Sequence, residues 1–265
     1  MKPLLTLILS LSFTLTAFGQ QGQYPDSGFT NKAEAKNLMV NGKKEGKWIE
    51  YVGGIFDTII DSNAYFYQLT IYSAAVPRGM QRLYRKTGEL FSETPYKNGK
   101  INGTYKRYFE WGGLIEKCTF IDDKKVGIDI WYNESDKGSK LWREIPYIDG
   151  KINGVIKEYS FGDGKLEGET PYTNGKRNGI EKRYYSYDKH LMRETTFIDD
   201  TVIGVIKEYY DDGKLKDETP CTNGKRNGVE KEYYESGKIH VMTTYENGKS
   251  LSQIMYDESG NEIKQ

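Results

Sequence analysis

The stretch that decides the fold lies near the C-terminal end and reads NGKRNGVEKEY, residues 223–233. Asn-Gly-Lys also begins at Asn41, Asn98, Asn174 and Asn247, and Asp149-Gly150-Lys151 is a variant of it. A second glycine follows four residues after the glycine of this motif, or after the residue in its place, and gives the series Gly46, Gly79, Gly103, Gly127, Gly154, Gly179, Gly204 and Gly228. Successive members lie mostly 24–25 residues apart, with an insertion after the first. A fixed period of this length is typical of a repeat protein.

Both halves of the repeat follow a pattern. A tyrosine stands five residues after each glycine of the series, at Tyr51, Tyr84, Tyr108, Tyr132, Tyr159, Tyr184, Tyr209 and Tyr233. Later in the unit, a large apolar residue is followed six positions on by an aromatic residue, as in Leu166 and Tyr172, although Cys221 replaces the ring once. Residues 150–199 and 200–248 are nearly copies of one another, which indicates an internal duplication.

Each unit is predicted to be a β-hairpin. Runs of about six residues rich in Val, Ile, Thr and Tyr are bounded by Asn-Gly, Asp-Gly or Ser-Gly, which tolerate the positive φ of tight turns. Two strands and two turns use the whole 24-residue period. A two-residue turn at Asp212-Gly213 predicts that Tyr210 faces Leu215, Tyr209 faces Lys216 and Lys207 faces Glu218. The same construction on Thr87-Gly88 pairs Arg82 with Glu93.

The predicted fold is all-β: an elongated single-layer array of stacked antiparallel β-hairpins. In the register above neither sheet face is wholly apolar, because Glu208 and Asp217 share one face with Thr219, and Lys207 and Glu218 share the other with Tyr209. A sandwich needs a clean apolar face. Sixteen strands spaced about 4.8 Å apart would extend roughly 75 Å.

The N-terminal segment resembles an export signal. Lys2 precedes the apolar run 4–15, and Ala17-Phe18-Gly19 has the small-x-small form of a signal-peptidase site. We expect a signal peptide at 1–19 and a protein that is exported, periplasmic or secreted, and not lipid-anchored, since no cysteine lies near the cleavage point. A retained anchor or a buried N-terminal helix is the alternative.

The remaining organisation follows from the repeat. We expect an N-terminal lead-in or cap at 20–45 with a short helix between Asn31 and Leu38. The hairpin repeats, about eight, occupy 46–247 and contain an inserted loop at 53–64. A degenerate C-terminal repeat at 248–265 is expected to act as a cap, since terminal repeats of an array must close its edges.

Composition argues against several classes of function. The chain has 38 Lys+Arg and 38 Asp+Glu, and this balance argues against a nucleic-acid binder. Two histidines and two distant cysteines suggest neither a metal site, a cofactor nor a catalytic triad. Cys118 and Cys221 are expected to be buried and too far apart for a disulfide. The chain is therefore expected not to be an enzyme.

Two sets of residues are candidate binding residues. The first is the tyrosine column Tyr84, Tyr108, Tyr159, Tyr184, Tyr209 and Tyr233. These rings suit stacking on sugars or gripping a peptide, but packing between repeats is the favoured interpretation. The second is the lysine column Lys157, Lys182, Lys207 and Lys231. It suits an anionic lipid or an acidic polymer, although the facing glutamates favour a solvated ion-pair ladder.

The pattern Asn-Gly-Lys-x-x-Gly-x-x-x-x-Tyr followed by Gly-Lys-Leu-x-x-Glu-x-x-Tyr resembles the MORN repeat, specifically the bacterial YwqK-type, antitoxin-like variant. The resemblance covers residues 38–260. It implies stacked antiparallel hairpins that serve as interaction surfaces and sometimes contact lipids. The antitoxin label implies a partner protein that is neutralised, whereas the signal peptide departs from a cytosolic antitoxin.

Three functions are compatible with these observations. The first is an exported, non-enzymatic scaffold that binds another protein in the cell envelope or outside the cell. The second is an antitoxin or immunity factor that blocks a toxin. The third is a module that binds cell-wall glycan or a membrane surface through the tyrosine column.

Overall fold

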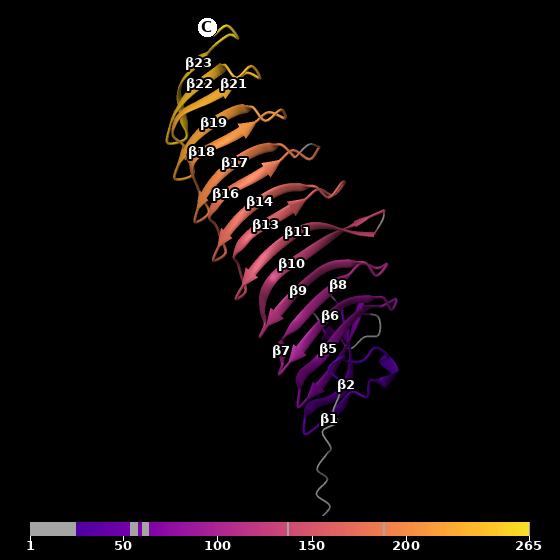
Figure 1. Cartoon of the computed structure of the whole chain (residues 1–265). Helices are drawn as coiled ribbons and strands as arrows, with labels where there is room; N and C mark the ends of the chain where they lie inside the picture. The colour runs from indigo at the N-terminus through magenta and orange to yellow at the C-terminus, as the bar shows by residue number, and fades with distance from the viewer. Residues whose placement is uncertain (1–24, 54–57, 60–63, 137, 188, 265) are drawn as a thin grey trace, which may run out of the picture.

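The chain forms one long antiparallel β-sheet (Figure 1). The computed structural model describes residues 25–53, 58–59, 64–136, 138–187 and 189–264. Successive hairpins lie side by side in sequence order, with the N-terminal strands at one end of the array and the C-terminal strands at the other. The predicted all-β array of stacked hairpins is confirmed. The predicted signal peptide and most of the 53–64 insertion lie outside the described residues.

The described residues of the N-terminal half form eleven strands and one short helical turn. The turn is the 3₁₀ helix η1 (Lys32–Glu34), which lies within the segment predicted to be helical. No described helix has the length and apolar character to cross a membrane. The strands are β1 (Leu38–Val40), β2 (Lys43–Val52), β3 (Thr58–Ile59), β4 (Phe66–Ser73), β5 (Val76–Arg85), β6 (Leu90–Lys97), β7 (Lys100–Ile101), β8 (Gly103–Tyr108), β9 (Leu114–Ile121), β10 (Lys124–Ser135) and β11 (Gly138–Ile148).

The C-terminal half continues the same order. Its strands are β12 (Lys151–Ile152), β13 (Gly154–Tyr159), β14 (Leu166–Thr173), β15 (Lys176–Arg177), β16 (Gly179–Tyr184), β17 (Leu191–Ile198), β18 (Thr201–Tyr209), β19 (Leu215–Thr222), β20 (Lys225–Arg226), β21 (Gly228–Tyr233), β22 (Ile239–Glu246) and β23 (Lys249–Met255). The short strands β7, β12, β15 and β20 lead directly into β8, β13, β16 and β21.

Two kinds of turn alternate along the array. At one edge, Asn-Gly and its variants form two-residue turns in which both residues have positive φ, as at Asn223 (φ 50°) and Gly224 (φ 76°). At the other edge, the loops are longer. The Asp212-Gly213 turn closes with Tyr210 N–H donating to the Lys214 carbonyl at 2.8 Å, and Gly213 has φ 82°. This geometry is the three-residue loop in which glycine takes the left-handed position.

The longer turn corrects part of the predicted register. Lys207 faces Glu218 and Arg82 faces Glu93, as predicted. Tyr209, however, faces Leu215 and not Lys216, because a bulge shifts the register between Glu208 and Tyr209. The prediction that Tyr210 faces Leu215 is therefore wrong as well.

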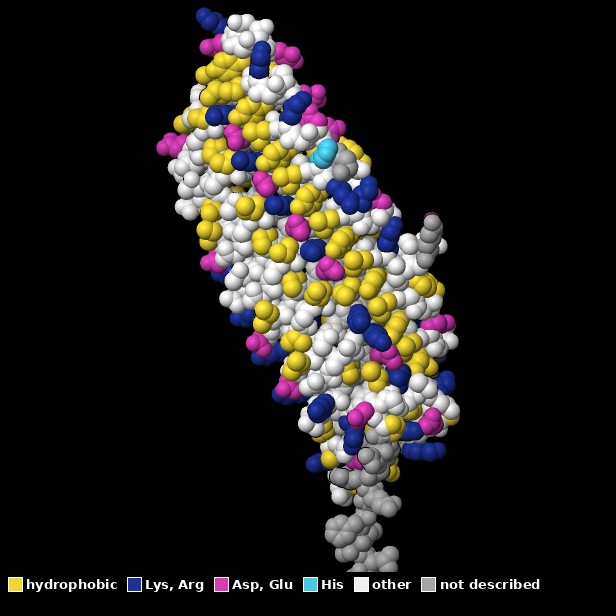
Figure 2. Space-filling view, in the orientation of Figure 1, with side chains coloured by type: hydrophobic (Ala, Val, Ile, Leu, Met, Phe, Trp, Pro, Cys, Tyr) yellow, Lys and Arg dark blue, Asp and Glu magenta, His cyan; other side chains and the backbone are white. Residues whose placement is uncertain are grey.

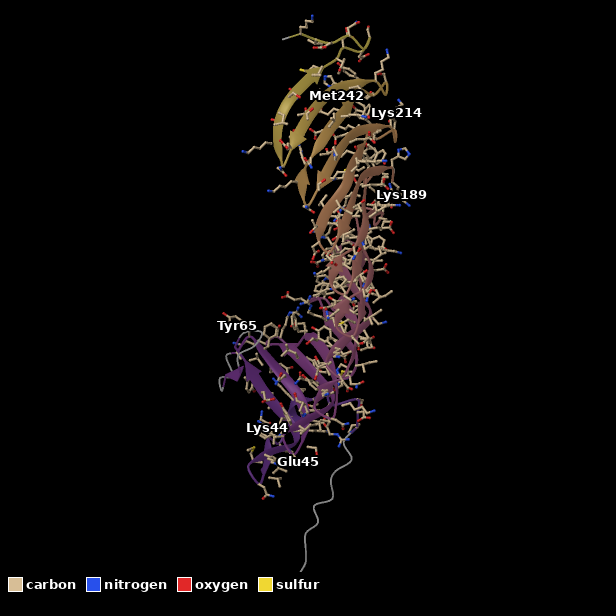
Figure 3. The ribbon with its side chains drawn as sticks, turned by 90° about the vertical axis from the view of Figure 1, so that its left-hand side faces the viewer. Lys44, Glu45, Tyr65, Lys189, Lys214 and Met242 are labelled. Atoms are coloured by element: carbon tan, nitrogen blue, oxygen red, sulfur yellow. The ribbon has the colours of Figure 1, made fainter. Side chains whose placement is uncertain are left out.

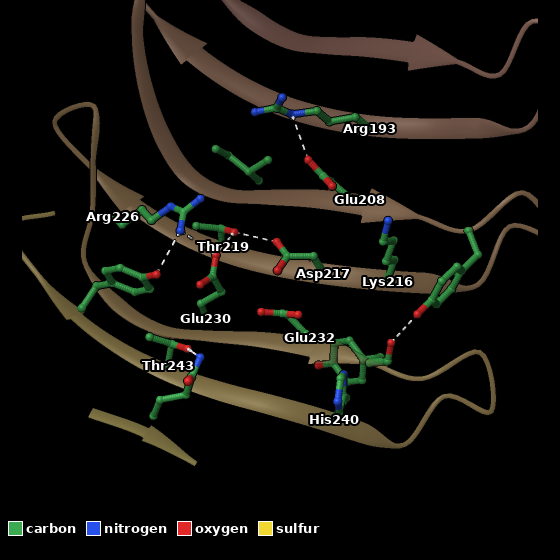
Figure 4. A pocket seen from close by; sticks show the side chains of 15 residues that line it. Arg193, Glu208, Lys216, Asp217, Thr219, Arg226, Glu230, Glu232, His240 and Thr243 are labelled. Carbon is green, nitrogen blue, oxygen red and sulfur yellow. Dashed lines mark hydrogen bonds and ion pairs between the residues drawn. The ribbon is translucent and has the colours of Figure 1, made fainter. Parts of the chain in front are cut away.

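The two faces of the sheet differ in burial. The inner face carries Ile156, Thr170, Thr195, Thr219 and Thr243, which are at most 6% exposed although no second layer of described residues covers them. The strands bend around this face (Figure 4). The outer face carries the column tyrosines and lysines. Strand twist also turns the edges, so Tyr65 and Lys189, which lie at the same edge in hairpin order, appear on opposite sides of Figure 3.

Residues N-terminal to β1 cover the outer face at the first hairpins. Phe29 packs with Leu69, Ile71 and Tyr84 in a buried cluster. The backbone carbonyl of Asp26 accepts a hydrogen bond of 2.8 Å from Met80 N–H, which fixes the segment against β5. This part of the array therefore has a conventional apolar core.

Candidate functional site

The column tyrosines bond across hairpins on the outer face. Each hydroxyl donates to a glutamate fifteen residues earlier, at 2.8–3.0 Å. The pairs are Tyr108 to Glu93, Tyr159 to Glu144, Tyr184 to Glu169, Tyr209 to Glu194 and Tyr233 to Glu218. Tyr84 differs, because it is buried and stacks on Tyr67 with ring centroids 5.2 Å apart. The hydroxyl groups of these five tyrosines are thus hydrogen-bonded within the protein.

The same contacts hold the hydroxyls in the neutral form. Burial, followed by the hydrogen bond and charge of the glutamate, raises the pKa of Tyr159, Tyr184, Tyr209 and Tyr233 to about 12. These rings are partly buried between neighbouring hairpins. Packing between repeats therefore accounts for the position of these tyrosines.

The column lysines lie in the same ladder on the outer face. Lys157 lies opposite Glu144 on one side and Glu169 on the other, and Lys182 and Lys207 are also placed between two glutamates. In the described part of the chain, none of the ammonium groups of Lys157, Lys182, Lys207 and Lys231 forms an ion pair within 4.0 Å. Figure 2 shows acidic and basic side chains alternating along the visible face. The charges balance locally, so this ladder has no strong net field.

A buried threonine column runs along the inner face, and sequence reasoning missed it. Its hydroxyls pair with glutamate or glutamine side chains on the next strand. Thr219 Oγ1 lies 2.9 Å from Glu230 Oε1, Thr170 Oγ1 lies 3.2 Å from Glu181 Oε2, and Gln253 Nε2 donates to Thr243 Oγ1 at 3.2 Å. The repeated Glu-Thr-Pro at residues 93–95, 169–171 and 218–220 was the available signal.

A pocket opens on the inner face between β17 and β23 (Figure 4). Its volume is about 550 Å³. Three acidic residues on adjacent strands, Glu208, Asp217 and Glu232, face one another directly in the register. Like charges directly opposite across strands are destabilising. The pocket also contains Arg193, Lys216, Arg226 and His240.

Within the acidic row, only Glu208 has an ion pair with a basic residue of the pocket, since Arg193 Nε lies 3.8 Å from Glu208 Oε1. Arg226 Nη1 lies 3.2 Å from the neighbouring Glu230 Oε1, outside the row. Asp217 instead accepts a hydrogen bond of 2.6 Å from the Thr219 hydroxyl. Burial, with smaller contributions from Glu230, Glu208 and Glu232, raises the pKa of Asp217 to about 6. The pocket is therefore suited to a cationic group.

A second inner-face cluster contains potential metal ligands. One ligand atom from each of Glu116, Cys118 and Asp129 lies within 4.8 Å of the others, and all three residues are buried. Lys125 Nζ, however, is 2.6 Å from Asp129 Oδ2 and 3.2 Å from Glu116 Oε1. Although burial acts in the opposite direction, the bond to Asp129 raises the pKa of Lys125. Lys125, together with Arg107 Nη2 at 3.3 Å from Glu116 Oε2, thus supplies the positive charge in this cluster.

Neither cysteine is in a disulfide, as predicted. Cys118 and Cys221 are buried, and burial raises the pKa of the Cys118 thiol to about 12. A thiol with so high a pKa is a poor nucleophile. Of the two histidines, His240 lies in the pocket with its ring 4.3 Å from that of Tyr234.

A second tyrosine in the Tyr-Tyr dipeptides links the hairpins at the long-turn edge. The hydroxyl of Tyr185 donates to the carbonyl of Tyr209 at 2.7 Å, and Tyr210 and Tyr234 bond likewise to Tyr233 and Tyr256. The dipeptide is visible in the sequence, but the hydrogen bond of its second tyrosine to the next hairpin depends on how the hairpins align. Tyr209 and Tyr233 therefore contact neighbouring hairpins twice, since the hydroxyl donates to a glutamate and the backbone carbonyl accepts from a tyrosine.

Comparison with known families agrees with this architecture. Residues 203–220 and 226–247 match the model of the MORN repeat variant. No curated protein matches the chain. The matched residues lie in strands β18 to β22 and their connections, the part of the array that contains most of the inner-face pocket. The match supports a MORN-repeat protein with a binding role.

Proposed function

We propose that the protein is an exported, non-enzymatic scaffold that binds a partner protein in the cell envelope or outside the cell, and that the inner-face pocket receives a basic segment of that partner. The observation that carries the proposal is the row Glu208, Asp217 and Glu232, in which like charges lie opposite one another on three adjacent strands. An arginine or lysine of a partner would relieve this repulsion.

The surroundings of the row support the same conclusion. The walls contain the hydroxyl of Thr243 and the amide of Gln253, which suit a peptide backbone as well as a charged group. The matched repeats form most of the pocket. The resemblance to MORN-type arrays implies an interaction surface and not an enzyme. If the partner is a toxin, the protein is an antitoxin, and the identity of the bound protein distinguishes that role from a structural one.

The binding proposal is tested by capture from a native envelope fraction. Wild-type protein is compared with the double variant Asp217→Asn with Glu232→Gln, and with a control that removes two charges outside the pocket, Glu235→Gln with Glu258→Gln. We expect the wild type and the control to retain one protein in a salt-sensitive manner and the pocket variant to lose it. Equal retention by all three would refute the pocket assignment.

Export is tested separately by the N-terminus of the protein recovered from its native cells. Cleavage after Gly19 predicts a chain that begins at Gln20 in the extracytoplasmic fraction. Intact protein recovered with the cytoplasm would refute export and leave the pocket proposal standing.

A further inference from the structure

The exposed aromatic side chains gather at one edge of the sheet. Four aromatic residues of the described chain are strongly exposed: Tyr65 (75%), Trp111 (50%), Phe161 (66%) and Tyr187 (59%). All four lie at the edge formed by the long turns. At the Asn-Gly edge, the strongly exposed large residues are aliphatic, among them Ile121, Ile148 and Ile198. Trp111, Phe161 and Tyr187 are here called the aromatic edge.

Inner rings support each member of the aromatic edge. Trp111 stacks on Phe109 with ring centroids 5.5 Å apart and planes within 5°. Phe161 stacks on Trp142 at 5.9 Å and 18°, and Tyr187 lies against Tyr185 at 5.6 Å. Supported rings are already ordered, so a ligand that stacks on them meets a smaller entropic cost.

Bonds between neighbouring turns fix the spacing of the rings. Trp111 Nε1 donates to Glu134 Oε1 at 2.7 Å on the following hairpin. Lys140 bonds to the carbonyl of Gly162, and Lys165 Nζ donates to the carbonyl of Tyr187 at 2.9 Å. Each of these bonds joins one turn to the next, so the edge from Trp111 to Tyr187 is a connected unit.

Formation of its turn does not require the Trp111 ring. Trp111 occupies the same place in its turn as Thr87, Asp212 and Ser236 occupy in three other long turns that have glycine next. Those turns close with the same backbone hydrogen bond, for example Gly213 N–H to the Tyr210 carbonyl at 3.0 Å and Gly112 N–H to the Phe109 carbonyl at 3.0 Å. The ring of Trp111 is therefore not needed to form its turn.

We propose that the aromatic edge binds an extended, β-linked polysaccharide. Two strands per hairpin at about 4.8 Å place successive long turns roughly 10 Å apart. Phe161 and Tyr187 therefore lie one hairpin apart, and Trp111 and Phe161 two hairpins apart. The two-sugar repeat of an extended β-1,4-linked chain is close to one hairpin in length, so alternate sugar rings of a chain that follows the twist of the edge meet successive platforms.

The chemistry around the rings favours sugar over a protein partner. The core of a protein interface is depleted of charged residues. Here charged residues separate the rings, among them Glu110, whose side chain is 82% exposed, and Asp163 and Lys189. A sugar ring presents an apolar face of C–H groups for stacking and a rim of hydroxyls for such neighbours.

Co-sedimentation with insoluble polysaccharides tests the proposal. The probes are a β-1,4-glucan and a β-1,4-linked N-acetylglucosamine polymer, with an α-1,4-glucan as the negative control. The test variant carries Trp111→Ser, Phe161→Ser and Tyr187→Ser. The matched control carries Ile121→Ser, Ile148→Ser and Ile198→Ser, which removes three exposed apolar side chains from the opposite edge. Far-ultraviolet circular dichroism verifies the fold of both.

We expect the wild type and the control to sediment with at least one β-linked polymer and not with the α-linked one. Each ring removed should weaken binding about three- to tenfold, so the triple variant should lose it. A wild type that sediments with neither β-linked polymer overturns the proposal, as does equal binding by the triple variant. Loss of the captured partner protein in the triple variant would assign the edge to protein recognition instead. The pocket variant Asp217→Asn with Glu232→Gln should keep its polysaccharide binding, so the two proposals fail independently.

Discussion

At the residue scale, the hydrogen bond between a column tyrosine and its glutamate is the clearest repeated interaction between hairpins. Tyr184→Phe removes a bond of 2.8 Å to Glu169 and leaves the ring in place. We expect a loss of about 1 kcal/mol in the free energy of unfolding, since a bond to a charged acceptor is worth somewhat more but this one is partly exposed. Urea denaturation measures the loss. Tyr172→Phe is the control, because the Tyr172 hydroxyl has no partner among the described residues; equal losses would contradict the assignment.

Asp217 gives a prediction with a definite pH dependence. Its folded-state pKa is raised from 3.8 to about 6, so its contribution to stability is full below about pH 4 and is lost as the pH rises through 6. Asp217→Asn removes this effect and keeps an acceptor for Thr219. We expect the variant to be more stable than the wild type by about 1 kcal/mol at pH 8, after allowance for solvent screening, and equally stable at pH 4. Thermal melts at both pH values measure this. An equal gain in stability at pH 4 and pH 8 would show that ionisation of Asp217 is not the cause of the gain.

These two residues also show what the sequence could not provide. The tyrosine column was evident from its spacing, but its bonds to glutamates fifteen residues earlier require the alignment of neighbouring hairpins. Asp217 was placed on the face with Glu208 from the alternation of side chains. Its opposition to Glu232 was not predicted, since it needs the pairing of β19 with β21 across the Asn-Gly turn.

At the element scale, each proline of a Glu-Thr-Pro or Glu-Ile-Pro segment is accommodated by a glycine on the next strand. Proline cannot donate to a sheet ladder and is found mainly at bulges. A Cβ on Gly179 would lie 2.9 Å from Pro171 Cγ, and Gly179 has φ 122°. The strand that pairs with Pro171 is interrupted at Asn178, between β15 and β16. There the Asn178 N–H donates to the Pro171 carbonyl at 2.9 Å. Glycine is thus required for both space and backbone geometry.

Gly179→Ala should therefore destabilise the array by roughly 2–4 kcal/mol, through strain and a clash together. Adding Pro171→Ala to the Gly179→Ala variant should restore the stability lost to the clash. The stability lost to the positive φ of residue 179 should remain lost. Gly224→Ala is the control, because a Cβ there meets nothing within 4 Å and only the positive φ opposes it. A double-mutant cycle on urea denaturation measures the coupling. Additive effects at Gly179 and Pro171 would refute the close contact.

The long turns explain why the predicted register was only partly correct. Asp212-Gly213 was interpreted as a two-residue turn, and the pairs beyond the bulge, such as Lys207 with Glu218, were nevertheless correct. The bulge compensates for the extra turn residue, so the error is confined to Tyr209, Tyr210 and their neighbours. Composition does not reveal such a compensation, since Asp-Gly occurs in both kinds of turn.

At the scale of the whole molecule, a sheet with one principal layer is stable because the curved inner face buries its own side chains. Low hydrophobic content, 37%, is consistent with this arrangement, since threonine, glutamate and tyrosine occupy much of the interior. Each hairpin contacts mainly its two neighbours, so stability is expected to be a sum of hairpin and interface terms. Removal of whole hairpins in register should then leave the remainder folded.

Deletion of residues 150–199 tests that expectation, because the new junction restores the original chemistry. Asp149 would precede Asp200, which regenerates the Asp199-Asp200 turn. Arg143 and Glu144 would meet Glu208 and Lys207, as Arg193 and Glu194 do in the intact protein. We expect a folded array shortened by four strands, or roughly 19 Å, measured as the maximum dimension in small-angle scattering. Deletion of residues 150–187 removes one and a half hairpins and should not fold, since it reverses the direction of every later strand. If the in-register deletion unfolded as completely, the sheet would be a single cooperative unit and not an array of hairpins.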